Sequence, residues 1–273
     1  MPELPEVETI KLGLQKYLVG HTLVEIELRL PKQFHGDKAQ AIGAKILAIR
    51  RFGKGLVIDL DNQFSLAIHV KMTGQLIYDA GEKKLDLSLP DKYTHIIFHL
   101  DHGATLYYRD VRQFGWVKVV PTVDILDLPF FKNLGKEPLK DLTLDYFRLL
   151  IKRYQTPIKQ LLMEQRKVAG IGNIYANDAL YLAKIHPKRK AASLTDQEIK
   201  QLFIAVETVL QKGIKTGGAS ERDYVNAIGG KGSYQKYFQV YKKTGQPCRR
   251  CGTIIERITQ GGRGTFFCPI CQR

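Results

Sequence analysis

Long apolar stretches are missing from this 273-residue sequence, and cysteines are missing from most of it. No run of 18 apolar residues occurs, about the minimum for a membrane-spanning helix, so we expect no membrane segment. The charged N-terminus does not resemble a secretory signal peptide. All four cysteines lie in the last 26 residues. These absences favour a cytoplasmic protein without a disulfide framework.

Acidic residues are scarce in the second half of the chain, and this distribution accounts for the net charge of +15. Residues 1–147 contain 19 Lys and Arg and 19 Asp and Glu, whereas residues 148–273 contain 23 basic and 8 acidic residues. A neutral half joined to a strongly basic half indicates two modules, and the length agrees with about two domains. We expect the basic module to face a polyanion, and nucleic acid fits best.

The cysteines form two pairs, Cys248-x2-Cys251 and Cys268-x2-Cys271, separated by 16 residues. This spacing is typical of a four-thiolate zinc ribbon, with strands predicted over residues 253–258 and 265–267. Two disulfides are the alternative, which a reducing compartment disfavours. We therefore predict one structural zinc ion per chain, because four thiolates leave no coordination position open for chemistry.

The first half of the sequence predicts one helix followed by many short strands. Apolar residues recur at helical spacing over residues 5–18. Eight strand-like runs follow at turn spacing and predict a β-sandwich or barrel, at residues 22–30, 45–51, 56–60, 65–70, 75–78, 93–100, 105–109 and 115–119. Residues 121–141 contain three prolines and no clear period, which indicates a linker between domains.

From Leu142 onward the pattern is helical. Helices are predicted over residues 143–154, from the N-cap Thr156 to about 165, over 173–183, and from a capping box at Thr195 to about 215. Residues 217–232 contain five glycines and predict a loop. The fold class is α+β, with a sandwich over 1–131, a helical domain over 132–216, and a loop and ribbon over 217–273.

The N-terminal residues suggest covalent chemistry. Loss of Met1 would leave Pro2 with a free secondary amine, and an α-amino group titrates at about pH 8, roughly two units below lysine. Such an amine can attack a carbonyl carbon and form a Schiff base. Glu3 and Glu6 are close enough to supply an acid or a base. The alternative is that Pro5 opens a helix whose dipole the glutamates complement, and these residues alone favour that alternative.

Two other clusters allow both a structural and a DNA-binding interpretation. The turn at residues 170–173 places glycines at a helix start, where backbone amides can bind a phosphate, and the basic surroundings favour that role. In the β-rich half, Met72 and Phe114 are residue types that proteins insert between bases, with Arg112 as a polar partner. Composition alone nevertheless favours a core position for Met72 and Phe114.

Three motifs together resemble formamidopyrimidine-DNA glycosylases. They are Pro-Glu-Leu-Pro-Glu-Val-Glu at residues 2–8, Gly-Ile-Gly-Asn-Ile-Tyr-Ala at 170–176, and a terminal ribbon with Gly-Gly-Arg-Gly-Thr at 261–265. The resemblance runs from Pro2 to Cys271. It implies an N-terminal β-sandwich with flanking helices, followed by a helix–two-turn–helix domain with a zinc ribbon. It also implies that damaged double-stranded DNA binds in the cleft between the two halves. It also implies a monomer that acts on the bacterial nucleoid.

The resemblance further implies a bifunctional repair enzyme, which removes 8-oxoguanine and formamidopyrimidines and then cleaves the strand by β,δ-elimination. Pro2 would attack C1′ of the damaged nucleotide, Glu3 would be the general acid that opens the sugar, and Glu6 would support it. Lys54 matches the residue assigned to proton donation in β-elimination, and Arg263 the one assigned to δ-elimination.

DNA-contacting residues are carried over on the same basis. Phosphates around the lesion would be held by Lys159, Asn173 and Arg263. The gap left by the flipped nucleotide would be filled by Met72, Arg112 and Phe114, which reverses the interpretation from composition.

Departures from the family pattern and rival functions limit what the resemblance implies. Tyr93 stands where the family often has a DNA-contacting histidine, and Gln155 where it often has a phosphate-contacting lysine. The family's residues in the loop that covers the flipped base cannot be matched one by one to residues 219–223. The lesion preference therefore stays open. The endonuclease VIII branch shares the Pro-Glu start but not the longer motif or the Arg–Phe wedge. A non-enzymatic DNA-binding protein would not need Pro2, and an RNA-binding accessory factor would give a free proline no task.

Overall fold

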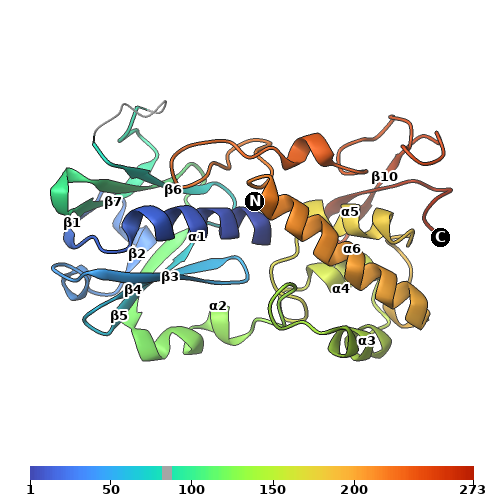
Figure 1. The fold of residues 1–273 in the computed structure, drawn as a ribbon, viewed down its shortest axis with the longest axis horizontal. Helices are drawn as coiled ribbons and strands as arrows, with labels where there is room; N and C mark the ends of the chain where they lie inside the picture. The colour runs from blue at the N-terminus through green and yellow to red at the C-terminus, as the bar shows by residue number, and fades with distance from the viewer. Residues whose placement is uncertain (82–87) are drawn as a thin grey trace. The chain divides into compact units, whose positions relative to one another are not determined.

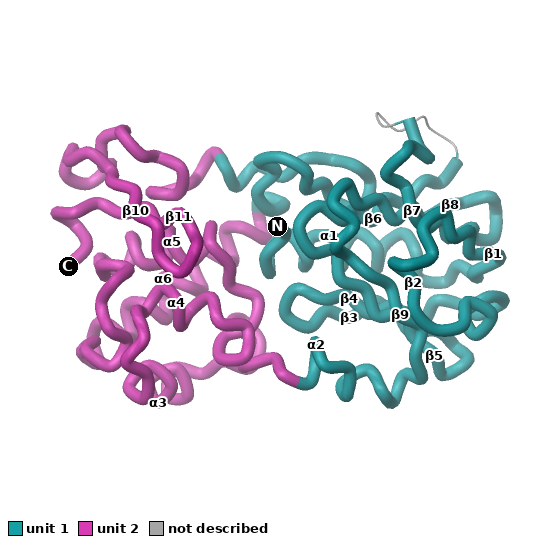
Figure 2. Tube along the Cα trace, turned by 180° about the vertical axis from the view of Figure 1, so that it is seen from behind, with its two compact units in different colours: residues 1–132, 216–235 teal, residues 133–215, 236–273 magenta. Residues whose placement is uncertain are grey.

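The computed structural model describes residues 1–81 and 88–273 (Figure 1). Two compact units make up the chain (Figure 2). Unit 1 comprises Met1–Lys132 and Thr216–Gln235, and unit 2 comprises Asn133–Lys215 and Lys236–Arg273. The segment Thr216–Gln235 therefore belongs with the N-terminal residues, whereas the sequence-based division groups most of it with the ribbon.

Two sheets form the body of unit 1. The four-stranded sheet has the order β1 (Leu23–Leu28), β7 (Thr94–Leu100), β8 (Thr105–Asp110) and β6 (Gly74–Asp79). The five-stranded sheet has the order β2 (Phe34–His35), β9 (Trp116–Pro121), β5 (Phe64–His69), β4 (Gly55–Leu60) and β3 (Ile46–Phe52). Both contribute to one hydrophobic core, which includes Phe98 and Tyr108 from the first sheet and Ile58 and Leu66 from the second. The predicted β-sandwich is confirmed.

Helix α1 (Leu4–Leu18) contacts β3 and β6, which are edge strands of the two different sheets (Figure 1). Its apolar stripe, Val7, Ile10, Leu14 and Leu18, is fully buried in the shared core. Burial of each such side chain contributes about 2 kcal/mol. The same packing fixes the position of the residues that precede the helix, Pro2 and Glu3.

The predicted linker is partly structured. A 3₁₀ helix at Thr122–Asp127 is followed by α2 (Pro129–Lys132), whose aromatic rings pack on the β3–β4 hairpin. A Cβ atom at Gly55 would lie 2.7 Å from the rings of both Phe130 and Phe131. Four residues are too few for a helical period to show in the sequence, which is why the linker interpretation missed α2.

Four main helices form the body of unit 2: α3 (Leu144–Arg153), α4 (Ile158–Met163), α5 (Asn173–Leu182) and α6 (Asp196–Lys215). The capping box is confirmed, since the Thr195 amide donates to Glu198 Oε2 at 2.8 Å and the Glu198 amide donates to Thr195 Oγ1 at 3.2 Å. The predicted N-cap of α4 is wrong. Pro157, not Thr156, precedes the helix, because its extended backbone forms a bridge with Lys190.

Strands β10 (Glu256–Gln260) and β11 (Arg263–Phe267) form the predicted hairpin near the C-terminus. Gly261 and Gly262 make its two-residue turn, and both have positive φ, which glycine adopts without strain. Among the described residues, no helix is long and apolar enough to cross a membrane.

Candidate functional site

One buried carboxylate, that of Glu6 in the first turn of α1, binds the backbone that precedes the helix. Pro2 and Glu3 are buried, and the Glu3 amide donates to Glu6 Oε2 at 2.8 Å. The other oxygen, Glu6 Oε1, accepts from the Ala219 amide at 2.8 Å. A single carboxylate therefore joins the N-terminal turn to the segment Thr216–Gln235 of the same unit.

Close packing accompanies this connection. Gly218 has φ of +79°, and a Cβ atom there would lie 2.8 Å from Glu6 Cγ. Burial raises the pKa of the Tyr224 phenol, and the charge of Glu6 raises it further. The glycines predict this loop from the sequence, but its contact with Glu6 is formed only in the fold.

Lys54 lies in the two-residue turn of the β3–β4 hairpin, after Gly53 with φ of +57°. It is only 5% exposed, which is unusual for a lysine in a turn. Arg51 ties this hairpin to α1, because its Nε donates to Glu8 Oε2 at 2.5 Å and its Nη1 to the Gly53 carbonyl at 2.9 Å. Burial alone would raise the pKa of Glu8, but the cations of Arg51 and Lys11 outweigh burial and lower it. The ion pair thus fixes the hairpin that carries Lys54 to the helix that follows Pro2.

His69 is a buried neighbour of this hairpin, and the sequence pattern alone does not indicate a role for it. Its pKa is lowered to about 3 by burial, and the charges of Lys71 and Lys54 add to this effect. Its ring packs edge-on against Phe130, with 4.5 Å between centroids. His69 is therefore neutral at physiological pH and adds no positive charge beside Lys54.

Met72, Arg112 and Phe114 lie on two turns of unit 1, after β5 and after β8 respectively. Phe114 is 53% exposed, and the guanidinium carbon of Arg112 lies 4.6 Å from its ring centroid. The interpretation of Phe114 as a core residue is therefore wrong, whereas Met72 is half-buried. A large exposed aromatic ring stacked with a cation is typical of a binding surface.

Tyr93 lies close to two cations. The guanidinium carbon of Arg109 and the Nζ atom of Lys92 lie 5.0 Å and 5.1 Å from its ring centroid. The position that often carries a histidine in the resembling family therefore presents an aromatic ring beside positive charge.

In unit 2, Lys159 and Asn173 converge on the carbonyl oxygen of Gly264. Lys159 Nζ donates to it at 3.1 Å and Asn173 Nδ2 at 3.0 Å. Lys159 Nζ also donates to Thr265 Oγ1 at 2.7 Å, and the side chain is only 1% exposed. Arg263, next along the chain, is exposed. The three residues assigned to phosphate binding are thus gathered at one turn, but Arg263 alone among them is exposed.

The turn between α4 and α5 is closed by the side chain of Gln165. Its Oε1 accepts from the Gly170 amide at 2.9 Å, and its Nε2 donates to the Ile171 carbonyl at 2.8 Å. Gly170 has φ of +88°, which explains the glycine. The predicted glycine turn before Asn173 is present. Gln155 is exposed just before α4.

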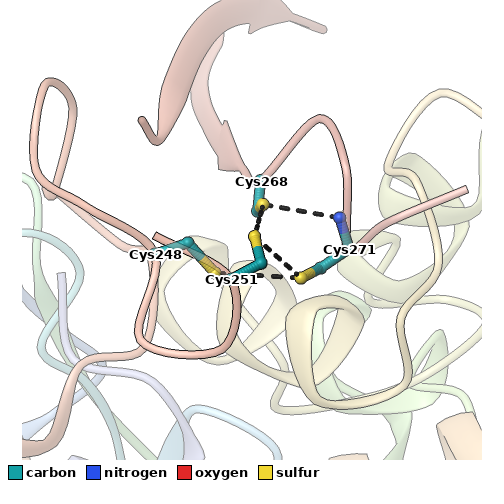
Figure 3. A group of neighbouring side chains, drawn as sticks. All are labelled: Cys248, Cys251, Cys268 and Cys271. Atoms are coloured by element: carbon teal, nitrogen blue, oxygen red, sulfur yellow. Dashed lines mark hydrogen bonds between the residues drawn. The ribbon is translucent and has the colours of Figure 1, made fainter. Parts of the chain in front are cut away.

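The four cysteines lie together and are not paired as disulfides (Figure 3). Their sulfur atoms lie within 4.8 Å of one another, with Cys248–Cys271, Cys251–Cys268 and Cys251–Cys271 separations of 3.9, 3.5 and 3.4 Å. A tetrahedral ion with Zn–S bonds of about 2.3 Å requires sulfur–sulfur distances of about 3.8 Å. The four thiolates therefore fit one structural zinc ion.

Surrounding groups support the zinc site. The Arg250 amide donates to Cys248 Sγ at 3.4 Å and the Cys271 amide to Cys268 Sγ at 3.4 Å. Cys248 and Cys268 share a hydrophobic cluster with Tyr181 of α5. The zinc site therefore fixes the β10–β11 hairpin to the helical part of unit 2.

Three family models match the chain in order. The formamidopyrimidine-DNA glycosylase N-terminal domain matches residues 1–117, the formamidopyrimidine-DNA glycosylase H2TH domain matches 134–225, and the zinc finger found in FPG and IleRS matches 245–273. Their order is the one that the three sequence motifs predict.

Similar proteins cover the whole chain. The formamidopyrimidine-DNA glycosylases of Pelotomaculum thermopropionicum and Streptococcus pneumoniae are 42% and 41% identical to it, over 100% of this chain and 99% of each relative. A Lactococcus lactis FPG mutant in complex with Fapy-dG-containing DNA has a TM-score of 0.91 at 37% identity, over 100% of both chains. The L. lactis protein in complex with abasic-site DNA has a TM-score of 0.90 at 37% identity, over 99% of both chains. The chain therefore belongs to the formamidopyrimidine-DNA glycosylase family, whose members are bifunctional DNA glycosylases and AP lyases.

Proposed function

We propose that this chain excises oxidised purines from duplex DNA through a Schiff base on Pro2, and then cleaves the strand. The observation that carries the proposal is the buried carboxylate of Glu6, which fixes the backbone of Glu3 directly beside Pro2. A general acid must lie beside the nucleophile that it assists, and this short turn supplies that arrangement.

The chemistry follows from the amine. After loss of Met1, the Pro2 nitrogen would attack C1′ of the damaged nucleotide while the base departs with the glycosidic electron pair and takes up the proton that the amine loses. Glu3 would protonate the ring oxygen of the deoxyribose, so that the ring opens and an iminium joins Pro2 to the sugar.

Strand cleavage would then follow by two eliminations. When C2′ loses a proton, a double bond forms to C3′, the C3′–O bond breaks and the 3′ phosphate leaves with its electron pair. The ammonium of Lys54 would protonate the departing phosphate oxygen. Arg263 would assist loss of the 5′ phosphate in the second elimination. A zinc ion held by Cys248, Cys251, Cys268 and Cys271 would supply only structural stability, because all four of its ligands would be thiolates.

DNA contacts in this proposal divide between the two units. Met72, Arg112 and Phe114 would occupy the gap left by the extruded nucleotide, since a base inside the stack cannot be reached by Pro2. Tyr93 would contribute a further contact from unit 1. Phosphates would contact Arg263 and Asn173, with Lys159 acting through the turn at Gly264.

Substrate class and location rest on the relatives. The L. lactis complexes hold Fapy-dG-containing and abasic-site DNA, and we propose the same lesion classes, together with 8-oxoguanine, for this chain. Its relatives are bacterial, and we infer action on the chromosome in the cytoplasm. The division at 1–131, 132–216 and 217–273 stays a proposal, with the loop 217–232 assigned to cover the flipped base.

Covalent trapping tests this proposal. Borohydride reduces an iminium to a stable amine, so incubation with 8-oxoguanine duplex and borohydride should attach DNA to Pro2, as located by mass spectrometry. A chain that keeps Met1 has an amide nitrogen at Pro2, and should bind DNA without trapping it. Met1 is 43% exposed, so its removal is sterically possible.

Glu3→Gln separates base release from trapping. It should slow release of 8-oxoguanine by about 10²-fold or more, because general acid catalysis is lost. A pre-formed abasic site already offers its carbonyl and should still be trapped. Glu25→Gln, an exposed glutamate of the same unit, serves as the control and should behave as wild type. Lesion-dependent cleavage by a chain that retains Met1 would refute the mechanism and favour a lysine nucleophile. A chain beginning at Pro2 that binds DNA but neither traps nor cleaves it would instead favour a non-enzymatic DNA-binding protein.

A further inference from the structure

Met72, Arg112 and Phe114, here called the wedge, lie on two turns. The carboxylate of Asp110, the last residue of β8, is fully buried and lies between these turns. Its Oδ1 accepts from Thr73 Oγ1 at 2.5 Å and from the Arg112 amide at 3.3 Å. Its Oδ2 accepts from the Gly115 amide at 2.8 Å and from Gln33 Nε2 at 3.1 Å. The donors include a residue next to Met72, a residue next to Phe114, and Arg112 itself.

Both turns have a conformation that needs support. Lys71, before Met72, has φ of +48°, and Gln113, before Phe114, has φ of +57°. Residues other than glycine adopt this left-handed region only when their surroundings hold them there. The Thr73 hydroxyl also accepts from the Arg112 amide at 2.9 Å, so the two turns are joined directly as well as through Asp110.

The backbone is also closely packed at two glycines of these turns, Gly74 and Gly115. A Cβ atom at Gly115 would lie 2.8 Å from the His69 carbonyl oxygen, and one at Gly74 would lie 2.5 Å from the Val70 carbonyl oxygen. The first turn therefore closes tightly on itself and the second packs against the end of β5, so neither glycine leaves room for a larger residue. The two turns form one unit around the Asp110 carboxylate.

We propose that Asp110 is a positioning residue for the insertion of Met72, Arg112 and Phe114 into DNA. It holds the Met72 turn and the Arg112–Phe114 turn, before DNA binds, in the conformation that places these side chains for insertion. This inference rests on the proposed wedge role of these residues. Insertion of mobile side chains would lose conformational entropy on binding, and pre-organisation avoids much of that loss. An ionised carboxylate suits the task, because it accepts only and can serve all four donors at once.

Asp110→Asn is the first test. The carboxamide can still accept at one oxygen, but its NH₂ group faces donors and cannot accept from them. With 2-aminopurine next to the lesion as a fluorescent reporter of insertion, we expect a smaller fluorescence change. Excision of 8-oxoguanine should fall by about tenfold, and cleavage of an abasic site, which has no base to extrude, should fall by much less.

Thr73→Val is a milder variant, because it keeps the shape of the side chain and removes only the hydroxyl that joins the turns. We expect the same selectivity, with a loss of about threefold on the lesion. The matched control is Ser65→Ala, which removes a buried hydroxyl that donates to the carboxylate of Asp59 at 2.7 Å in the other sheet. Any loss of activity in Ser65→Ala should be equal on 8-oxoguanine and on the abasic site.

A double-mutant cycle separates the positioning role from the wedge role. If Asp110 acts through the wedge, Asp110→Asn should cost little more once Phe114 is already alanine, and Thr73→Val likewise. Full additivity, with Phe114→Ala alone selective for the lesion, would overturn the positioning role and leave the wedge intact. Equal losses on both substrates for Phe114→Ala alone would instead overturn the wedge proposal, and the role of Asp110 with it.

Discussion

The two units hold their candidate DNA-binding turns with buried groups of opposite charge. In unit 1, the carboxylate of Asp110, fully buried, accepts from the turns that carry Met72 and Phe114. In unit 2, the ammonium of Lys159, 1% exposed, donates to the turn that carries Arg263. Each group shapes a short segment that side-chain packing alone leaves underdetermined.

The sign of the buried charge fits what each turn presents to solvent. A carboxylate gathers amide and hydroxyl donors, which suits turns that expose an aromatic ring and its stacked guanidinium. An ammonium gathers carbonyl oxygens, so Lys159 engages the Gly264 oxygen and adds positive potential near Arg263. The charge distribution shows the same contrast, since residues 1–147 have no net charge and residues 148–273 carry the net positive charge.

Loss of the zinc site should give the largest effect, because it removes the support of the unit 2 turn while leaving unit 1 untouched. Cys251→Ser or Cys268→Ser should abolish zinc content, DNA binding and strand cleavage together, since metal binding and folding of such a ribbon are coupled. Elemental analysis, gel-shift binding and cleavage assays measure the three.

The control for the ribbon is Ile270→Ser, an exposed residue between two ligands, which should keep its zinc and its activity. Proteolysis should show a protected unit 1 in the cysteine variants. Full activity in a metal-free preparation would contradict the zinc assignment.

Features with a strong local signal could be predicted from the sequence. The cysteine spacing identified the ribbon, the Thr195–Glu198 pattern identified the start of α6, and the apolar period identified α1. These succeed because the interacting residues lie within a few positions of each other or, in the ribbon, form two short pairs whose internal spacing is typical of metal ligands. By contrast β2 has only two residues, and its parallel pairing with β9 leaves no alternation to detect.

The buried charges could not be predicted, because their partners are distant along the chain. Lys159 binds residues more than 100 positions away, and Gln33 reaches Asp110 across 77 positions. A lysine in a basic half of a chain is expected on the surface, and an Asp at a strand end in a turn. Only the tertiary fold turns either residue inward, and the contact of Glu6 with Ala219 is of the same kind.

Removal of the exposed Phe114 ring tests the turns of unit 1. We expect a smaller effect on activity than from loss of the zinc site. Phe114→Ala should reduce excision of 8-oxoguanine by about tenfold or more and leave unfolding unchanged, because the exposed ring lies outside the core and would contact distorted DNA. Cleavage of a pre-formed abasic site should fall less. Leu126→Ala removes a similarly exposed apolar side chain of the same unit and should have no effect on either substrate. Equal losses on both substrates would show that Phe114 does not act as a wedge.

The smallest expected effect concerns salt dependence and the unit 2 turn. Each phosphate neutralised contributes about 0.9 to the slope of log K against log salt concentration. Arg263→Ala should therefore flatten the slope by about 0.9, because its exposed guanidinium would contact a phosphate itself. Lys159→Met keeps the length of the side chain but loses the bonds to Gly264 and Thr265, so affinity should fall while the slope changes by less than about half as much. Lys200→Ala, an exposed cation of α6, is the control for charge alone. A slope for Lys159→Met as flat as that for Arg263→Ala would mean that the ammonium turns outward to a phosphate, and the contrast between the two units would then not hold in the bound state.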